Sequence, residues 1–331
     1  MRKGRTDGWA VWVMLVVVVG FCVMVALVSD TRAAEGYPSK PLTYTIFWPP
    51  GGRSDIVARM ISPFIEKHLG TPVVVNNNVG GAGVIGHKEV REAKPDGYLV
   101  AQSGTTVMFQ YTKPGISLWD YSWVANIYSA PFVIAVPSSS PFKNLKEMVD
   151  FGKANPKKLR HGNSGTGSTT HLGSAGFGMK TGVEFTQIAY KGEGPAVIGI
   201  ASAEVDVAFG PMVAFKQMIE AGKIRTLAVC APNRSRQNPD LPTCKELGYD
   251  FNWDAWEAIF GPKGLPGNKA VWPKLSEAIK KAILDPELDQ KLMSIGLEVQ
   301  YRAGEELERW LKVNDQEIRK IIFDLGLQYK P

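Results

Sequence analysis

Glycine-rich turns recur in this chain at one point of the pattern, between a strand-like apolar run and a helix-like segment. The first, PPGGRSD, occupies residues 49–55 and follows the apolar run 42–48, and similar turns occupy residues 80–86 and 163–171. Strand-like and helix-like segments alternate along most of the chain, which is typical of α/β domains with mainly parallel sheets. In open α/β sheets, ligands bind at the carboxyl ends of the strands. The sequence therefore predicts an α/β fold with a ligand site built from these turns.

Chain length and segment order indicate two domains. The chain has 331 residues, which is above the usual range for one domain. The segment 137–141, rich in Pro and Ser, is the best candidate for a linker. We expect residues 35–136 and 258–331 to form the first domain and residues 137–257 the second. Three amphipathic helical stretches are expected to return and cover the first domain: 271–284, 286–295 and 305–325.

The N-terminal residues have the layout of a secretory signal. Basic residues at positions 2, 3 and 5 precede an uncharged stretch, 8–29, and a pair of alanines follows it. We expect residues 1–34 to be a signal peptide and the mature protein to be periplasmic. Because the apolar stretch reaches the roughly 20 residues of a membrane-spanning helix, an uncleaved anchor is the alternative. In the oxidising compartment outside the cytoplasm, Cys230 and Cys244 either form a disulfide or stay unpaired.

The charge balance favours small anions as partners. The formal net charge of +6 falls to +4 without residues 1–34, which carry four basic and two acidic side chains. Nucleic-acid binding needs a clustered basic patch, and since Lys and Arg are spread along this chain we expect no nucleic-acid partner. A modest positive balance suits the attraction of small anions. The 4 histidines have no metal-binding spacing, so neither a metal nor another cofactor is expected.

The glycine turns supply the candidate ligand-binding residues. A turn of this kind points free backbone N–H groups at an anion. Arg53 either grips a carboxylate in bidentate fashion or is a solvated arginine, whereas Asp55 and Ser168 are suited to capping helices. Lys191 likewise faces an anion or is solvated. The candidate set is Gly51, Gly52, Arg53, Ser54, Asp55, Gly81, Ala82, Ser103, Ser164, Gly165, Thr166, Ser168, His171, Lys191 and, as weaker candidates for the cleft wall, Gly210 and Trp256.

Two enzymatic alternatives have partial motifs. The segment 81–86 fits the G-x-G-x-x-G dinucleotide fingerprint, but the next strand ends at Ser103 without the acidic residue that would hold a ribose. A secreted serine hydrolase would use Ser164 and His171, although the G-x-S-x-G elbow lacks its last glycine. Neither motif is complete, so we expect a binding protein and not an enzyme.

The ordered segments resemble the substrate-binding receptors of tripartite tricarboxylate transporters, the Bug-type binding proteins. The resemblance runs from about Tyr37 to the C-terminus and follows the segments YPSKPLTYTIFWPPGGRSDIVAR, PVVVNNNVGGAGVIG, KPDGYLV, NSGTGSTTHL, YKGEGPA, VDVAFGP and KIRTLAV. It implies a fold similar to type II periplasmic binding proteins, with two α/β lobes joined by two crossovers around a ligand cleft. It also implies a monomer that grips a small organic carboxylate between residues 51–55 and 164–171 and delivers it to a membrane permease.

Three positions depart from the family pattern. Arg53 stands where a glycine or small residue is common, Asn78-Val79 replaces a usual Arg-Pro, and Phe209-Gly210-Pro211 replaces a common Phe-Asp pair. These departures bear on the identity of the ligand more than on the fold.

Overall fold

The structure, a computed structural model, describes residues 36–330. The predicted signal peptide, residues 1–34, lies outside this range. Among the described residues, no helix is both long enough and apolar enough to cross a membrane.

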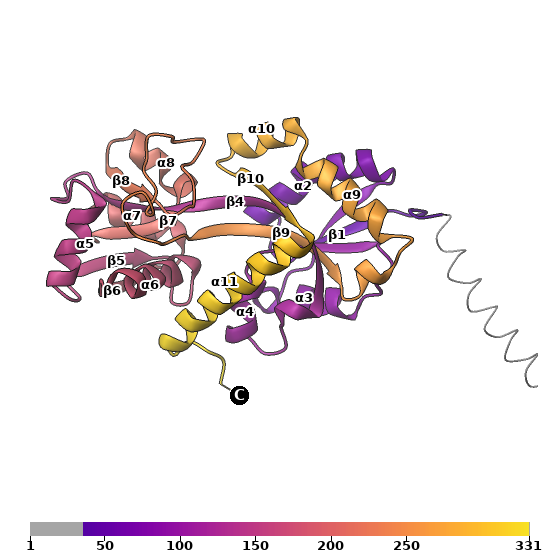
Figure 1. Cartoon of the computed structure of the whole chain (residues 1–331), viewed down its shortest axis with the longest axis horizontal. Helices are drawn as coiled ribbons and strands as arrows, with labels where there is room; N and C mark the ends of the chain where they lie inside the picture. The colour runs from indigo at the N-terminus through magenta and orange to yellow at the C-terminus, as the bar shows by residue number, and fades with distance from the viewer. Residues whose placement is uncertain (1–35, 331) are drawn as a thin grey trace, which may run out of the picture.

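One mixed sheet passes through two α/β lobes, which lie at opposite ends of the molecule (Figure 1). In lobe 1 the strand order is β2-β1-β3-β9-β4, and β10 pairs with β4. The parallel strands are β1 (Leu42–Ile46), β2 (Val73–Asn77) and β3 (Leu99–Ser103). The antiparallel strands are β9 (Asp254–Pro262), the first half of β4 (Tyr121–Pro137) and β10 (Glu298–Ala303).

Helices cover both faces of the lobe 1 sheet. Neighbouring residues of a strand point to opposite faces, and Val100 and Ala101 of β3 accordingly lie in two different apolar clusters. One cluster lies against α2 (Arg53–Leu69), α9 (Trp272–Ile283) and α10 (Pro286–Ser294). The other includes Val90 of α3 (Val84–Glu92).

Lobe 2 repeats this arrangement. The second half of β4 pairs with β7 (Val207–Pro211) and β8 (Ile224–Val229), and β7 continues to β5 (Leu159–Asn163) and β6 (Phe185–Ala189). Its helices are α5 (Leu145–Ala154), α6 (Thr169–Thr181), α7 (Glu193–Ala201) and α8 (Met212–Glu220). The α/β class and the two lobes are thus confirmed.

Two extended crossovers join the lobes. In β4, Pro131 pairs with Asp254 in the lobe 1 sheet, whereas the next residue, Phe132, pairs with Pro211 in the lobe 2 sheet. The second crossover runs beside it, because the Phe132 N–H donates to the Trp253 carbonyl at 3.0 Å. The sequence predicted mainly parallel sheets, but β4 and β9 run antiparallel to their neighbours, so the sheet is mixed. The change of sheet lies inside β4, upstream of residues 137–141.

The last helix bridges the lobes. Helix α11 (Gly304–Asp324) crosses the junction diagonally (Figure 1). Asp315 accepts hydrogen bonds from Gln110 and Tyr111 of α4 (Thr106–Thr112) in lobe 1. Ile321 lies against Gly176 of α6 in lobe 2. Helices α9 and α10 cover lobe 1 as expected, whereas α11 packs against both lobes.

Cys230 and Cys244 are buried free thiols, with their Sγ atoms 3.7 Å apart. The disulfide alternative is therefore not formed in this structure.

Candidate functional site

Helix α2 in lobe 1 and helix α7 in lobe 2 are among the helices that begin without a capping side chain. Helix α2 starts at Arg53 after Gly52, and α7 starts at Glu193 after Gly192, with no side-chain cap hydrogen bond at either end. The first amides of an α-helix have no partner within the helix, so both ends offer free N–H groups and positive dipole ends. The charge of Arg53 opposes the rise that burial causes in the pKa of Glu193, so the first residues of these two helices lie near one another across the lobes.

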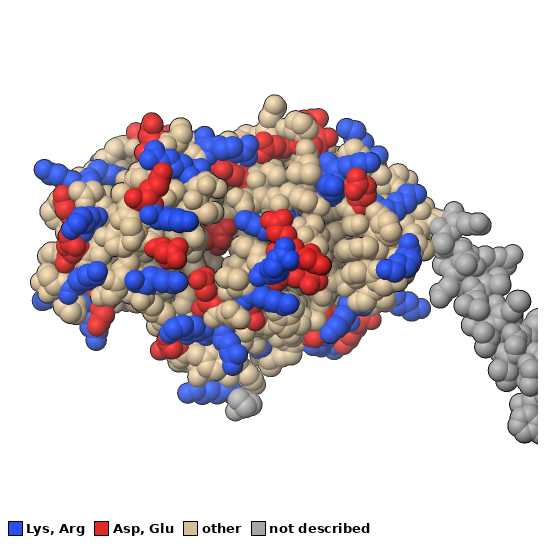
Figure 2. Space-filling model, in the orientation of Figure 1, with Lys and Arg blue, Asp and Glu red and all other residues tan. Residues whose placement is uncertain are grey.

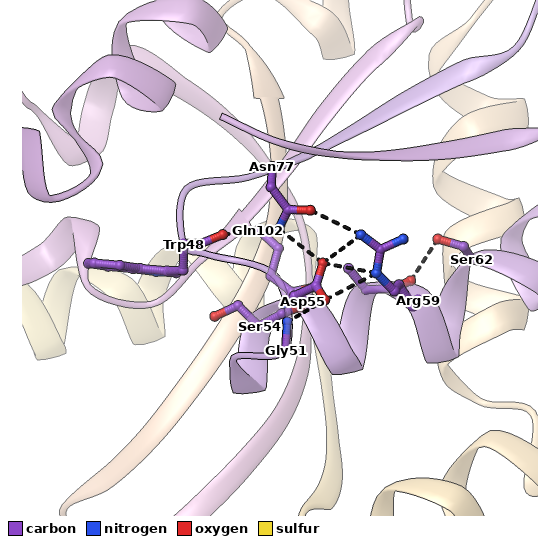
Figure 3. Close-up of polar contacts among 9 residues, drawn as sticks. Trp48, Gly51, Ser54, Asp55, Arg59, Ser62, Asn77 and Gln102 are labelled. Atoms are coloured by element: carbon purple, nitrogen blue, oxygen red, sulfur yellow. Dashed lines mark hydrogen bonds and ion pairs between the residues drawn. The ribbon is translucent and has the colours of Figure 1, made fainter. Parts of the chain in front are cut away.

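Asp55 fixes the turn that precedes α2 (Figure 3). Its buried carboxylate accepts hydrogen bonds from the Gly51 N–H at 2.9 Å, from Asn77 Nδ2 at 2.9 Å and from Arg59 Nε at 3.0 Å. The Arg59 hydrogen bond, followed by those from Gly51 and Asn77, lowers the pKa of Asp55 to about 2 against the opposing effect of burial. All of these donors belong to lobe 1, so Asp55 positions the turn from behind and does not face the gap between the lobes.

A second carboxylate, that of Glu257, lies beneath the same turn. Glu257 belongs to β9 and is only 7% exposed. Its Oε1 accepts from the Ser54 hydroxyl and its Oε2 from Nε2 of Gln102. The other end of the Gln102 amide accepts from the Tyr44 hydroxyl, which fixes the orientation of that amide. Ser54 therefore uses its hydroxyl within lobe 1, and both oxygens of Glu257 accept a hydrogen bond from lobe 1 side chains.

Arg53 and Tyr128 lie next to Glu257. Tyr128 is fully buried, and its hydroxyl lies close to both charged groups without an ordinary hydrogen bond to either. Burial, and then the charge of Glu257, raises the pKa of Tyr128. The pKa of Arg53 is also raised, first by Tyr128 and then by Glu257 and Glu193, against an opposing effect of burial. Protein atoms surround Arg53 closely enough to oppose its charge, yet its side chain is still accessible to solvent. It makes no ion pair within 4.0 Å to any described residue, so its guanidinium donors are available to a ligand.

A small cavity of about 70 Å³ is lined by Arg53 and Glu257 of lobe 1 and by Thr169 of lobe 2, but not by Tyr128 or Glu193. Its walls include Arg53, Thr105, Thr169, Trp253, Trp256 and Glu257. A larger cavity, of about 570 Å³, adjoins it around residues 252–254 and is bounded by α11, β10 and α6. The space-filling view is hollowed between the lobes (Figure 2). None of the predicted turn residues lines the larger cavity, so the smaller one marks the candidate site.

The glycine turn of lobe 2 uses most of its amides internally. The N–H of Ser164 donates to Thr170 Oγ1 at 2.8 Å, that of Gly165 to Asn163 Oδ1 at 3.0 Å, and that of Gly167 to His171 Nδ1 at 3.0 Å. Ser168 caps α6, as expected. The prediction that this turn points free amides at an anion is therefore wrong for these residues. In this turn, Thr166 is exposed and Thr169 lines the cavity, so these two residues are accessible to a ligand.

The hydrolase pair is not assembled. Ser164 Oγ contacts Thr170 Oγ1 at 2.9 Å, and the described contacts include no hydrogen bond between Ser164 and His171. Burial lowers the pKa of His171, and its Nδ1 already accepts from a backbone amide. Within residues 36–330 there is also no group of His, Cys, Asp or Glu side chains placed to hold a metal ion.

The remaining candidates lie in different places. Ser103 is buried beside Thr105, and Trp256 lines the cavity while packing on Trp310 with ring centroids 4.7 Å apart. Residues 81–83, which include Gly81 and Ala82, form a 3₁₀ turn, and a Cβ at Gly83 would meet Phe109, Phe47 and His87 of lobe 1. Gly210 is buried against Phe215, and Lys191 is exposed without an ion pair to a described residue.

Sequence reasoning missed Glu257, Tyr128, Glu193 and Gln102. A charged residue inside an otherwise apolar strand was a usable signal for Glu257, because such residues are rarely buried without a partner. Glu193 lies within the YKGEGPA segment, two residues after the candidate Lys191, and was not chosen. Tyr128 gave no signal, since the strand around it was not predicted.

Comparisons with known proteins agree with this architecture. A sequence model of the family described as "Tripartite tricarboxylate transporter family receptor" matches residues 57–327. The UPF0065 protein in the tcbD-tcbE intergenic region of Pseudomonas sp. (strain P51) is 32% identical over 307 residues, covering 90% of this chain and 91% of that protein.

Two solved structures show the same fold. A TctC solute binding protein from Polaromonas, without ligand, superposes with a TM-score of 0.79 at 28% identity, covering 87% of this chain and 99% of that one. R. palustris Rpa4515 with adipate gives a TM-score of 0.69 at 26% identity, covering 88% and 98%. The family match extends over most of the chain and the curated relative over most of both chains. The protein therefore belongs to the tripartite tricarboxylate transporter family of receptors.

Proposed function

We propose that this protein is a periplasmic solute receptor. It captures a small carboxylated organic anion between its lobes and delivers the anion, as a monomer, to a membrane permease of the tripartite tricarboxylate type. The observation that carries the proposal is the cavity wall at Arg53, which begins the uncapped helix α2, makes no ion pair to a described residue and lies near the start of α7 in lobe 2. The crystallisation of the relative Rpa4515 with adipate supports carboxylate binding.

The geometry suggests how an anion would be held. A carboxylate accepts hydrogen bonds from N–H groups at a helix N-terminus and a bidentate pair from an arginine. Arg53 can supply both, because it contributes a guanidinium and lies in the first turn of α2. The α7 end then approaches from lobe 2 as the lobes close about the crossovers at Pro131 and Trp253. Because both helix ends must be near the guest, closure and binding are coupled.

Isothermal titration calorimetry against a panel of mono-, di- and tricarboxylates tests the proposal. We expect at least one acid to bind. In Arg53→Ala the affinity for that acid should fall by about 30- to 100-fold, because a charge-assisted hydrogen-bonded pair worth about 2–3 kcal/mol is lost. Arg53→Lys should restore the charge but not bidentate geometry, so we expect intermediate affinity. Arg234→Ala removes an exposed arginine paired with Glu246 and should bind like the parent protein.

The non-enzymatic role has its own control. Ser164→Ala should retain carboxylate binding, and neither it nor the parent should hydrolyse an activated ester. Ester turnover that disappears in Ser164→Ala would favour the hydrolase. If neutral sugars bind and no carboxylate does, the receptor proposal for organic acids is wrong.

A further inference from the structure

The candidate site contains more negative than positive charge close to Arg53. Arg53 is the cation among the groups that perturb one another there, and Glu257 and Glu193 are both carboxylates. Glu193 comes from α7 in lobe 2 and Glu257 from β9 in lobe 1. A guest that carries only carboxylates would satisfy Arg53 but would place another anion beside these two side chains. A buried charge is tolerated only when it is paired and hydrogen-bonded.

The carboxylate of Glu257 has acceptor sites that its described hydrogen bonds do not use. An ionised carboxylate offers about four lone-pair sites, and the Ser54 hydroxyl and the Gln102 amide use one site on each oxygen. The Gln102 amide cannot reverse without losing the Tyr44 hydroxyl that donates to its oxygen. Glu257 also lines the small cavity together with Arg53. Acceptor sites therefore remain at the wall that a guest would touch.

Tyr128 adds an independent observation. Its side chain is fully buried, yet its hydroxyl has no hydrogen-bond partner among the described residues. Buried hydroxyls are rarely left without a partner in native proteins. The hydroxyl lies close to Arg53 and Glu257, which line the small cavity, although Tyr128 itself does not line it.

We infer that the guest is a zwitterion, an organic acid that carries an ammonium group beside its carboxylate, as amino acids do. This inference rests on the proposed capture of a carboxylate and names its class. The carboxylate lies at Arg53 and the free amides of α2, and the ammonium group donates to Glu257. Glu193 closes over the same ammonium group from lobe 2.

The test compares acids that differ only at the carbon next to the carboxylate. Calorimetry is carried out with the sets alanine, lactate and propionate; aspartate, malate and succinate; and glutamate, 2-hydroxyglutarate and glutarate. We expect the amino member of the best-binding set to bind at least about tenfold more tightly than its unsubstituted and hydroxy partners, since an ion pair to a buried carboxylate is stronger than a neutral hydrogen bond.

Variants of the two carboxylates test which of them causes the preference for the amino member. Glu257→Gln keeps the shape of the side chain and removes its charge. The affinity for the amino member should therefore fall by at least about tenfold, while the unsubstituted acid binds equally or more tightly. Glu193→Gln, at an exposed position, should reduce the same preference by a smaller factor. Glu184→Gln removes an exposed carboxylate that pairs with Lys157 and should leave the preference unchanged.

Each outcome decides a different point. If unsubstituted or hydroxy acids bind as tightly as the amino member, or if Glu257→Gln leaves the ratio unchanged, the zwitterion inference is overturned while carboxylate capture stands. If no acid of any kind binds, the proposed function itself fails. Should Glu257→Gln not fold, the ratios of the unmodified protein and of Glu193→Gln still decide the inference.

Discussion

At the scale of single residues, Asp55 fixes the conformation of the turn at residues 49–55 in the absence of ligand. Its carboxylate ties the Gly51 amide, Asn77 and Arg59 into one network, so the turn is fixed to β2 and to its own helix. Gly51 has a φ of +82°, in the region that glycine adopts without strain. A turn fixed in this way loses little conformational freedom on binding, which favours affinity.

The Asp55 network predicts an acid-dependent loss of stability. The pKa of Asp55 is about 2 in the folded protein against 3.8 for an ordinary Asp, so the folded state favours the ionised form. Its stabilising contribution is complete above pH 4 and is lost as the pH falls from about 4 to about 2. Urea unfolding across this range should show a shallower pH dependence for Asp55→Asn than for the parent. Asp240→Asn, an exposed aspartate, is the control, and an unchanged slope in Asp55→Asn would contradict the prediction.

The sequence identified the residues of this turn but not their partners. Glycines and an aspartate at the start of a helix are local signals, since they belong to the turn itself. Asp55 does not cap α2 as expected, because Gly52 occupies the N-cap and Asp55 accepts from the Gly51 amide instead. Glu257 is separated from Ser54 by 203 residues, and no local rule links the two. Arg53 was left open between ligand contact and solvated arginine for the same reason. Its role depends on Tyr128, Glu257 and Glu193, which only the folded chain brings together.

At the scale of helices and strands, backbone conformation and packing account for the glycines of segment 81–86, so no bound dinucleotide is needed to explain them. Helix α3 passes so close to β1 that a Cβ at Gly86 would lie 2.1 Å from the Phe47 ring. Gly80, Gly81 and Gly83 have φ values of +149°, +56° and +95°. The first glycines therefore shape the turn, and the last permits close packing of helix and strand. This is a structural use of a fingerprint that also occurs in nucleotide-binding proteins.

Gly86→Ala should destabilise the fold by about 1–3 kcal/mol, because an added methyl group in a packed core forces neighbours to shift. Guanidinium unfolding measures this change, and calorimetry on the folded variant should show unchanged carboxylate affinity. Gly36→Ala is the control, since an added Cβ there meets nothing within 4 Å. A melting temperature raised by NAD in the parent protein would contradict the structural interpretation of these glycines.

The secondary structure was predictable where apolar periodicity was strong and not where polar residues are buried. Helix α9 follows its predicted span, 271–284, closely. At the start of α5, Asn144 and Glu147 form a capping box, a pattern that is local in sequence. The first half of β4 was missed because Ser122, Asn126 and Ser129 interrupt its apolar pattern while being buried. Helices α4 and α8 and strand β10 are short, and tertiary contacts stabilise them more than their own sequence does.

At the scale of the molecule, the two lobes are not independent units. Strand β4 belongs to both sheets, and α11 contacts α4 in lobe 1 and α6 in lobe 2. Any closing motion therefore has to bend the crossovers while α11 keeps contact with both lobes. This arrangement limits relative motion to a hinge about one region, which suits a receptor with two discrete states.

Ile321 tests this coupling. It is buried where α11 meets α6, so Ile321→Ala should cost about 2–4 kcal/mol. Because both lobes share β4 and α11, we expect calorimetric unfolding of the parent in a single transition, and of the variant at a lower temperature. Val313→Ala, an exposed position on the same helix, is the control and should change little. Two well-separated transitions in the parent protein would show that the lobes unfold independently.

The position of β9 also constrains the order in which the chain can fold. This strand lies between β3 and β4 in the lobe 1 sheet, although it is separated from them by the whole of lobe 2 in sequence. The N-terminal half, synthesised first, therefore cannot close its own sheet until residue 262 has emerged. Pairings between distant segments form slowly. The nascent polypeptide consequently remains incompletely folded until synthesis is nearly finished.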